Sequence, residues 1–380
     1  MTETKIYKKL GSFKNINLNN LNFNSETERI KKVFDDNTFI TKLSDYEKKI
    51  ILDVKEELFL KKNSTFKLNN YVIEEIKTIP DDKLLLYLFH RYRYEIHPEK
   101  NILDEYPPYL QIEPSSICNY RCVFCFESDK SFTNKKSGFM GTMNLDLFKS
   151  IIDKAVGNIE FLSLASRGEP LVSKSINDML RYTEGKFLNL KLNTNASLLN
   201  EEKIHAILSG GVKTLVFSAD AADEKLYSEL RVNGNLKTVL KNIELFNDIK
   251  EKKYPNSKII TRVSGVKVND KQDFKEMNSF WSKLVNQVAF VDYNPWENVY
   301  NNKPNEITTP CSDLWRRMFI WWDGKVNPCD TDYKSQLSIG NVKNFDLKEL
   351  WNSKKYNDYR EKHLKKERSK ISPCKGCVVT

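Results

Sequence analysis

Two kinds of hydrophobic pattern divide the chain. Up to about residue 105 the apolar positions recur at helical spacing, as in Ile50, Val54 and Leu58, and this spacing predicts helices over 45–60 and 81–93. After residue 106, short apolar runs alternate with helical patterns. The short runs predict strands at 109–113, 159–165, 188–193, 213–219, 259–266 and 287–292.

The alternation of strand and helix is typical of parallel βα units. Asn144 and Asn235 precede two of the helical stretches and are suitable N-caps. Six such units predict an α/β fold, a parallel sheet curled into a partial (β/α)6 TIM-like barrel, with its site at the carboxyl ends of the strands. We expect a mainly helical N-terminal region of unknown role at 1–105, the barrel at 106–300 and a small hairpin–helix unit at 301–380.

Three cysteines follow the first predicted strand at the spacing C-x3-C-x2-C: Cys118, Cys122 and Cys125. Three thiolates on one short loop can hold three irons of a 4Fe–4S cluster, which leaves the fourth iron open to a small molecule. A zinc site or three buried thiols are the alternatives. Zinc normally takes four ligands, and no histidine lies near these three in the sequence.

This loop resembles the signature of the radical SAM superfamily, C-x3-C-x-aromatic-C, with Phe124 in the aromatic position. The resemblance implies that the open iron chelates S-adenosylmethionine (SAM) through its amino and carboxylate groups. Reductive cleavage of SAM then gives methionine and a 5′-deoxyadenosyl radical, which takes a hydrogen atom from the substrate. The superfamily's fold is a six-unit partial barrel, which agrees with the strand pattern.

The resemblance also assigns SAM contacts at the ends of later strands. Gly168-Glu169-Pro170 is similar to the GEP motif that binds the methionyl ammonium, and Asn193 opens a stretch similar to the TNG motif. A plain turn at Gly168 and a solvated cation at Arg231 are the alternatives. The cofactor-binding residues implied by the resemblance are Phe124, Gly168, Glu169, Pro170, Asn193, Ser218, Asp220 and Arg231.

Four further cysteines lie near the C-terminus at the spacing C-x17-C, a 44-residue gap, then C-x2-C. A hairpin with Asp323-Gly324 at its turn precedes the second of them. The layout resembles the twitch domain, the short form of the SPASM domain, in aminocyclitol dehydrogenases of the butirosin type. It implies one auxiliary 4Fe–4S cluster, with a structural zinc site as the alternative. The expected ligands are Cys311, Cys329, Cys374 and Cys377.

The two clusters would use all seven cysteines of the chain. An auxiliary cluster with four protein ligands has no open iron, so we expect it to accept or pass an electron rather than to bind the substrate. No thiol would then remain to return a hydrogen atom to a substrate radical. The cysteine count therefore disfavours an epimerase that quenches its radical with a cysteine.

Charge and hydropathy limit the partners and the cellular compartment that we expect for the protein. The chain has 61 Lys and Arg against 51 Asp and Glu, but the excess is diffuse, so nucleic-acid binding is not expected. The first residues are polar, and no apolar run is long enough to span a membrane. We expect a cytoplasmic protein with reduced thiols. The basic stretch 354–370 predicts either a solvated helix or a docking surface for a flavodoxin or ferredoxin-type electron donor.

The sequence thus favours a radical SAM oxidoreductase that acts on a sugar or an aminocyclitol-like small molecule. Modification of a ribosomal peptide is the second hypothesis, and a zinc-dependent nucleic-acid-binding protein is a remote third. The candidate catalytic residues are Glu297 and Arg262, chosen from their positions near the expected barrel mouth.

Overall fold

A parallel sheet forms the centre of the computed structural model, which describes residues 4–9, 23–61, 63–294 and 299–380. All six predicted strands are present, they pair in parallel, and they follow one another across the sheet in sequence order. The expected α/β partial barrel is confirmed. These strands are β1 (Tyr109–Ile112), β3 (Phe161–Leu164), β4 (Asn189–Thr194), β5 (Thr214–Ser218), β7 (Ile260–Lys267) and β8 (Gln287–Asp292).

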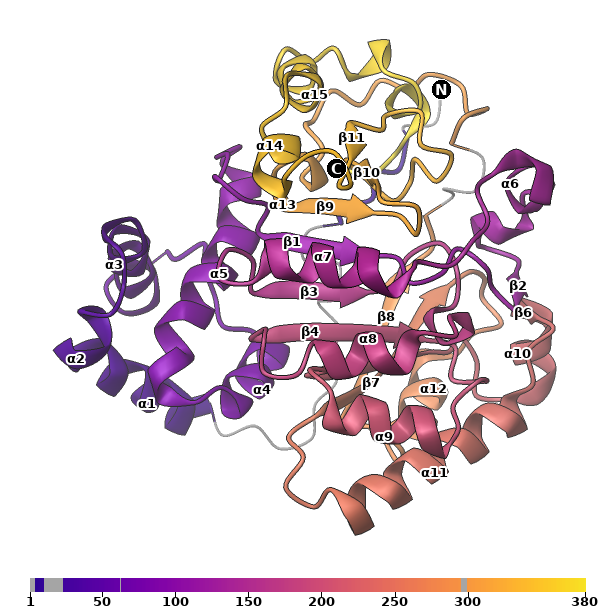
Figure 1. The fold of residues 1–380 in the computed structure, drawn as a ribbon, viewed down its shortest axis with the longest axis horizontal. Coiled ribbons are helices and arrows are strands. Elements are labelled where there is room, and N and C mark those ends of the chain that lie inside the picture. The colour runs from indigo at the N-terminus through magenta and orange to yellow at the C-terminus, as the bar shows by residue number, and fades with distance from the viewer. Residues whose placement is uncertain (1–3, 10–22, 62, 295–298) are drawn as a thin grey trace.

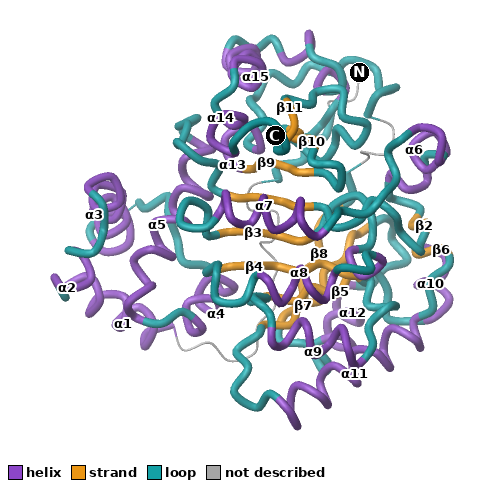
Figure 2. Tube along the Cα trace, in the orientation of Figure 1, coloured by secondary structure: helices purple, strands orange, loops and turns teal. Residues whose placement is uncertain are grey.

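Helices cover the outer face of the sheet (Figures 1 and 2). Residues of β1 and β3 such as Leu110 and Leu162 are fully buried, because parallel strands of this kind are covered on both faces. Asn144 and Asn235 cap α7 and α11, as predicted. The barrel helices are α6 (Lys130–Thr133), α7 (Leu145–Ala155), α8 (Ile176–Tyr182), α9 (Glu201–Ser209), α10 (Glu224–Leu230), α11 (Leu236–Lys253) and α12 (Phe274–Trp281).

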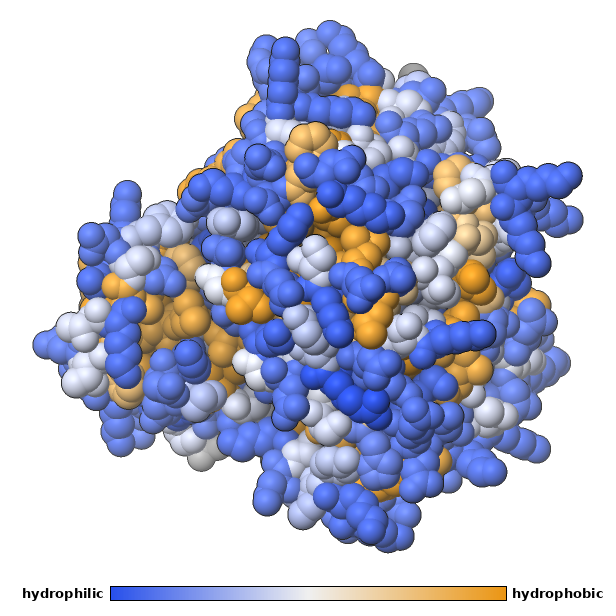
Figure 3. Space-filling model, in the orientation of Figure 1, coloured by the Kyte–Doolittle hydropathy of each residue, from blue (hydrophilic) through white to orange (hydrophobic). Residues whose placement is uncertain are grey.

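The N-terminal region folds as a helical unit with its own apolar core. That core extends to Tyr109 and Phe161, the first residues of β1 and β3. The helical unit therefore packs on the amino ends of the strands (Figure 1, left), and some of its apolar side chains show at the surface (Figure 3). Its helices are α1 (Phe23–Asp35), α2 (Asn37–Ile40), α3 (Asp45–Phe59), α4 (Asn70–Thr78) and α5 (Asp81–Glu99).

The C-terminal part contains the predicted hairpin, and Gly324 occupies its turn with a φ of 86° that favours glycine. Its first strand, β9, pairs in parallel with β1, which the sequence pattern had not indicated. The sheet therefore runs without a break from the barrel into this part. Its elements are β9 (Arg317–Ile320), β10 (Lys325–Asn327), β11 (Gly340–Asn341), α13 (Asp313–Arg316), α14 (Leu347–Trp351) and α15 (Lys354–Leu364).

Among the helices that the structure describes, none has the length and apolar character needed to cross a bilayer.

Candidate active site

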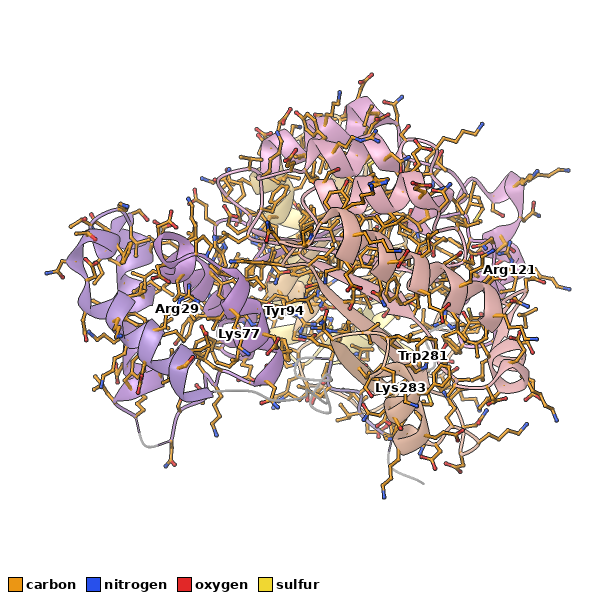
Figure 4. The ribbon with its side chains drawn as sticks, turned by 90° about the horizontal axis from the view of Figure 1, so that it is seen from below. Arg29, Lys77, Tyr94, Arg121, Trp281 and Lys283 are labelled. Carbon is orange, nitrogen blue, oxygen red and sulfur yellow. The ribbon has the colours of Figure 1, made fainter. Side chains whose placement is uncertain are left out.

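The loop of Cys118, Cys122 and Cys125, here called the cysteine loop, lies beyond the carboxyl end of β1. Within it, the short strand β2 (Arg121–Cys122) pairs with β6 (Arg231–Val232). Figure 4 labels Arg121 on the rim opposite the helical unit. The three thiols are free, and burial raises the pKa of each. The charges of Cys122 and Cys118 further raise the pKa of Cys125, so the three sulfurs lie within electrostatic reach of one another.

The four C-terminal cysteines also come together. Burial raises the pKa of Cys329, and the charges of Cys374 and Cys311 raise it further. In the same way, burial and then the charges of Cys377 and Cys311 raise the pKa of Cys374. All four thiols are free, although up to 65 residues lie between them in the sequence, from Cys311 to Cys377. A set of four adjacent thiols suits an iron–sulfur cluster.

No three or more His, Cys, Asp or Glu side chains in the described ranges are arranged as the ligands of a single metal ion. A cubane cluster distributes its cysteine ligands over separate irons. The donor sets of three and four free thiols fit a SAM-binding cluster and a fully ligated auxiliary cluster.

A small apolar cluster lies between the two sets of thiols. It is built on four buried side chains, and Cys125 of the cysteine loop and Cys377 both pack against it. Each expected cluster site therefore contributes one cysteine to the surroundings of the same apolar cluster. The four buried residues are Phe126, Phe132, Val299 and Tyr333.

The predicted GEP motif lies directly against the cysteine loop. A Cβ atom on Gly168 would come within 2.6 Å of backbone atoms of residues 115–117, so only glycine fits there. The backbone N–H of Glu169 donates to the Ile117 carbonyl at 3.0 Å. Pro170, which follows, is buried at the first position of a short 3₁₀ helix.

The carboxylate of Glu169 joins the ends of β3 and β4. Its Oε1 accepts from the Leu171 N–H at 3.0 Å and the Thr194 hydroxyl at 2.7 Å. Its Oε2 accepts from the Asn195 N–H at 2.7 Å. This acid, which the motif assigns to the SAM ammonium, is thus already bonded to three donors of the chain.

In the TNG-like stretch, Asn195 contacts the cysteine loop. The Asn195 amide donates to Asn119 at 2.9 Å, and Asn119 donates to Ser197 at 2.9 Å. Asn193 lies two residues earlier, within β4, and is half-buried. The polar residues that follow Asn193 in the same motif were the signal for this alternative.

Asp220 and Arg231, both expected to contact SAM, pair with each other. Arg231 Nε lies 2.6 Å from Asp220 Oδ2, and Asp220 Oδ1 accepts from the Val266 N–H at 2.7 Å. Arg231 Nη1 also reaches the Cys122 sulfur at 3.9 Å, and its guanidinium lies 5.8 Å from the centre of the Phe124 ring. The pair thus holds β5, β6 and β7 beside the cysteine loop. Ser218, at the end of β5, is half-buried.

The structure adds a buried ion pair that the sequence did not single out. Arg167 donates to Glu113 through Nε at 2.7 Å and Nη2 at 2.6 Å, and through Nη1 to the Tyr333 carbonyl at 2.8 Å. The guanidinium lies 4.2 Å from the Trp321 ring centre, and the Trp322 N–H donates to Glu113 at 3.2 Å. These contacts connect the barrel to the C-terminal hairpin. A charged residue directly after β1 and another directly before Gly168 were the available signals.

The candidate Arg262 does not lie at the cysteine loop. It donates to Gln287, the first residue of β8, at 2.7 and 2.5 Å, and it lies 5.8 Å from the Tyr71 ring of α4. Both contacts are at the amino ends of the strands, beneath the helical unit. This position does not support the catalytic role that we predicted. The second candidate, Glu297, lies outside the described residues.

Comparison with protein families identifies the two parts of the chain. The family model of the radical SAM superfamily matches residues 112–280, and that of the iron–sulfur cluster-binding domain SPASM matches residues 311–378. The chain therefore carries a radical SAM domain followed by a SPASM domain. The expected cofactors are confirmed at this level: a SAM-binding iron–sulfur cluster, SAM, and auxiliary iron–sulfur binding in the SPASM domain.

Individual relatives are distant. The chain is 25% identical to GTP 3′,8-cyclase of Clostridium botulinum over 213 residues, 54% of this chain and 64% of that protein. It is 32% identical over 114 residues to a tungsten-containing aldehyde ferredoxin oxidoreductase cofactor-modifying protein of Pyrococcus furiosus, 30% of either chain. The chain thus covers less than two thirds of the length of these curated relatives.

Among solved structures, Streptococcus suis SuiB bound to S-adenosylmethionine aligns with a TM-score of 0.53 and 20% identity, over 97% of this chain and 91% of SuiB. BtrN in complex with AdoMet and 2-DOIA aligns with a TM-score of 0.47 and 16% identity, over 71% of this chain and 92% of BtrN. At this identity the likeness to SuiB shows the fold.

Proposed function

We propose that the protein is a radical SAM oxidoreductase that acts on a sugar or aminocyclitol-like molecule: it removes a hydrogen atom from a C–H bond, and the substrate radical then loses an electron and its hydroxyl proton. The observation that carries this proposal is the apolar cluster against which both Cys125 and Cys377 pack. A substrate bound beside this cluster would lie near both the radical source and an electron acceptor. On a secondary alcohol the outcome is a ketone.

Under this proposal, Cys118, Cys122 and Cys125 hold the SAM-binding cluster, and Cys311, Cys329, Cys374 and Cys377 hold the auxiliary cluster. When bound, these groups supply the reductive cleavage of SAM to a 5′-deoxyadenosyl radical and an acceptor for the electron that the substrate radical loses. The chain's own residues would orient SAM: Gly168 lets the GEP motif pack against the cysteine loop, and Arg231, Ser218, Asn193 and Phe124 would contact the cofactor.

A flavodoxin or ferredoxin-type protein would supply the reducing electron. Lysines of α15 and the turn after it form an exposed basic surface suited to an acidic donor. Two cations of this stretch do not contribute, because Arg360 and Arg368 are buried and bond to backbone carbonyls. The exposed residues are Lys354, Lys355, Lys365, Lys366 and Lys370.

Modification of a ribosomal peptide is the second candidate function. SuiB has been solved in complex with its precursor peptide SuiA, and it shares the fold of this chain with a TM-score of 0.53. The position of the helical unit weakens this candidate, since α4 and α5 pack on the amino ends of the strands rather than beside the cysteine loop. A leader peptide bound there would not reach the loop directly.

The test is anaerobic turnover with deuterium-labelled aminocyclitols, sugars and peptides, followed by mass spectrometry of the 5′-deoxyadenosine. Deuterium in 5′-deoxyadenosine together with a ketone product supports the first function. Deuterium transfer from a labelled peptide alone overturns it in favour of the second.

A further inference from the structure

Glu127 is a buried acid at the cysteine loop that lacks hydrogen-bond donors. It lies in the 3₁₀ turn Phe126–Ser128, directly after Cys125, and only 2% of its surface is exposed. Within the described structure, neither carboxylate oxygen accepts a hydrogen bond. Buried carboxylates are costly without donors, and nearly all in folded proteins have them. A bound molecule is therefore a suitable source of the missing donor.

Arg121, the nearest cation, does not donate a hydrogen bond to Glu127. Arg121 Nη1 lies 3.3 Å from Glu127 Oε2, as an ion pair without hydrogen-bond geometry. The same nitrogen already donates to the carbonyls of Cys118 at 2.7 Å and Tyr120 at 2.6 Å. One guanidinium thus lies between the Glu127 carboxylate and the backbone of Cys118. This contact places the acid beside the three thiols.

The ligand expected at this loop has one strong donor that needs an acid. SAM bound to the open iron through its amino and carboxylate groups would bring the N–H donors of that amine close to the cysteine loop. Glu169, the acid that the GEP motif offers, already accepts from Leu171, Thr194 and Asn195. Neither oxygen of Glu127 accepts a hydrogen bond from the described chain, although Oε2 lies 3.3 Å from Arg121 Nη1.

We infer that Glu127 is a SAM-binding residue whose carboxylate accepts a hydrogen bond from an N–H of the methionyl amino group. This inference rests on the proposed function, in which SAM binds at the cysteine loop. It assigns to Glu169 the different task of joining β3 to β4. A charged hydrogen bond at a buried site contributes about 10- to 100-fold in affinity.

The test compares two ligands on the anaerobically reconstituted full chain. SAM and the SAM analogue with hydrogen in place of the α-amino group are measured by equilibrium dialysis against wild type, Glu127→Gln and the control Glu229→Gln. Glu229 is an exposed acid of α10 that pairs with Lys271, so the control makes the same charge change at the surface. Iron content is determined for each variant.

We expect Glu127→Gln to bind SAM at least about tenfold more weakly, to bind the deaminated analogue as wild type does, and to keep its iron. Glu229→Gln should match wild type with both ligands. Unchanged SAM binding, equal weakening of both ligands, or loss of iron from Glu127→Gln each overturns the inference. Failure of the wild type itself to bind SAM would instead overturn the proposed function.

Discussion

Arg167 and Glu113 form a buried bidentate ion pair, with Nε–Oε2 and Nη2–Oε1 distances of 2.7 and 2.6 Å. Removing one partner of such a pair leaves an uncompensated charge, so we expect Glu113→Ala to lower the free energy of unfolding by about 3–5 kcal/mol. Because Arg167 precedes Gly168, SAM affinity should fall as well. Denaturant unfolding and equilibrium dialysis measure the two effects.

A matched control for this pair lies on the surface. Arg181 and Asp178 form an exposed ion pair at 3.2 Å on α8. Asp178→Ala should change stability by less than about 1 kcal/mol and leave SAM binding intact, because exposed pairs contribute little. If the two variants behave alike, the buried pair has no special role at this junction.

Glu75 anchors a buried charge network between the helical unit and the barrel. Its Oε2 accepts from Tyr87 at 2.7 Å and Asn189 at 2.8 Å, and its Oε1 lies 3.5 Å from Lys191 Nζ. Glu75→Ala would remove the carboxylate partner of Lys191, whereas Arg91 would keep Glu95 at 2.7 Å. We expect a loss of about 3–5 kcal/mol in thermal or chemical unfolding.

The neighbouring Glu74 provides the comparison. It pairs with Lys77 of the same helix at 2.8 Å, and both side chains are partly exposed. Glu74→Ala should cost less than about 1 kcal/mol. Comparable losses in the two variants would mean that helix α4 itself, rather than the network, determines the effect.

Ionisation of Tyr94 should make the free energy of unfolding depend on pH in the alkaline range. Burial raises the pKa of this phenol, but the guanidiniums of Arg316 and Arg317 outweigh burial and lower it to about 8. A depressed pKa stabilises the fold fully above the unfolded value of about 10 and loses this contribution as the pH falls through 8. The stability difference between wild type and Tyr94→Phe should widen from pH 8 to pH 10, by at most about 3 kcal/mol. A constant difference in melting temperature would contradict this assignment.

Iron content should separate the two sets of cysteines. Wild type should hold about eight irons after anaerobic reconstitution. Alanine at Cys118, Cys122 and Cys125 should reduce this to about four and abolish SAM cleavage. Alanine at Cys374 and Cys377 should also leave about four, with SAM cleavage retained and substrate oxidation lost. Zinc in place of iron at the C-terminal set would contradict the auxiliary cluster.

Much of the barrel could be predicted because its signals are local. Apolar runs bounded by turn residues gave the six strands, and Asn144 and Asn235 marked helix starts. The cysteine spacing and the glycine of the GEP motif are likewise short-range features. Gly168 shows why such a motif can be recognised from sequence: backbone atoms of residues 115–117 leave no room for a Cβ atom, so the position requires glycine.

The partners of charged side chains could not be predicted in the same way, because they lie far apart in sequence. Asp220 and Arg231 were each expected to contact SAM, yet they bind each other. Arg262 lies three residues into β7, and only the packing of α4 beneath the strands shows that it faces away from the cysteine loop. Tertiary contacts, not local pattern, set these roles.

The parallel pairing of β9 with β1, from Tyr109–Arg317 to Ile112–Ile320, also limits how this protein can be divided. If the chain were cut between the two iron–sulfur modules, β1 would lose its partner strand β9. Its unpaired backbone groups would then form an exposed sheet edge that promotes aggregation. The two modules thus share one continuous sheet and are not joined by a flexible linker alone. Exchange of the C-terminal module between relatives would have to preserve four residues of backbone register.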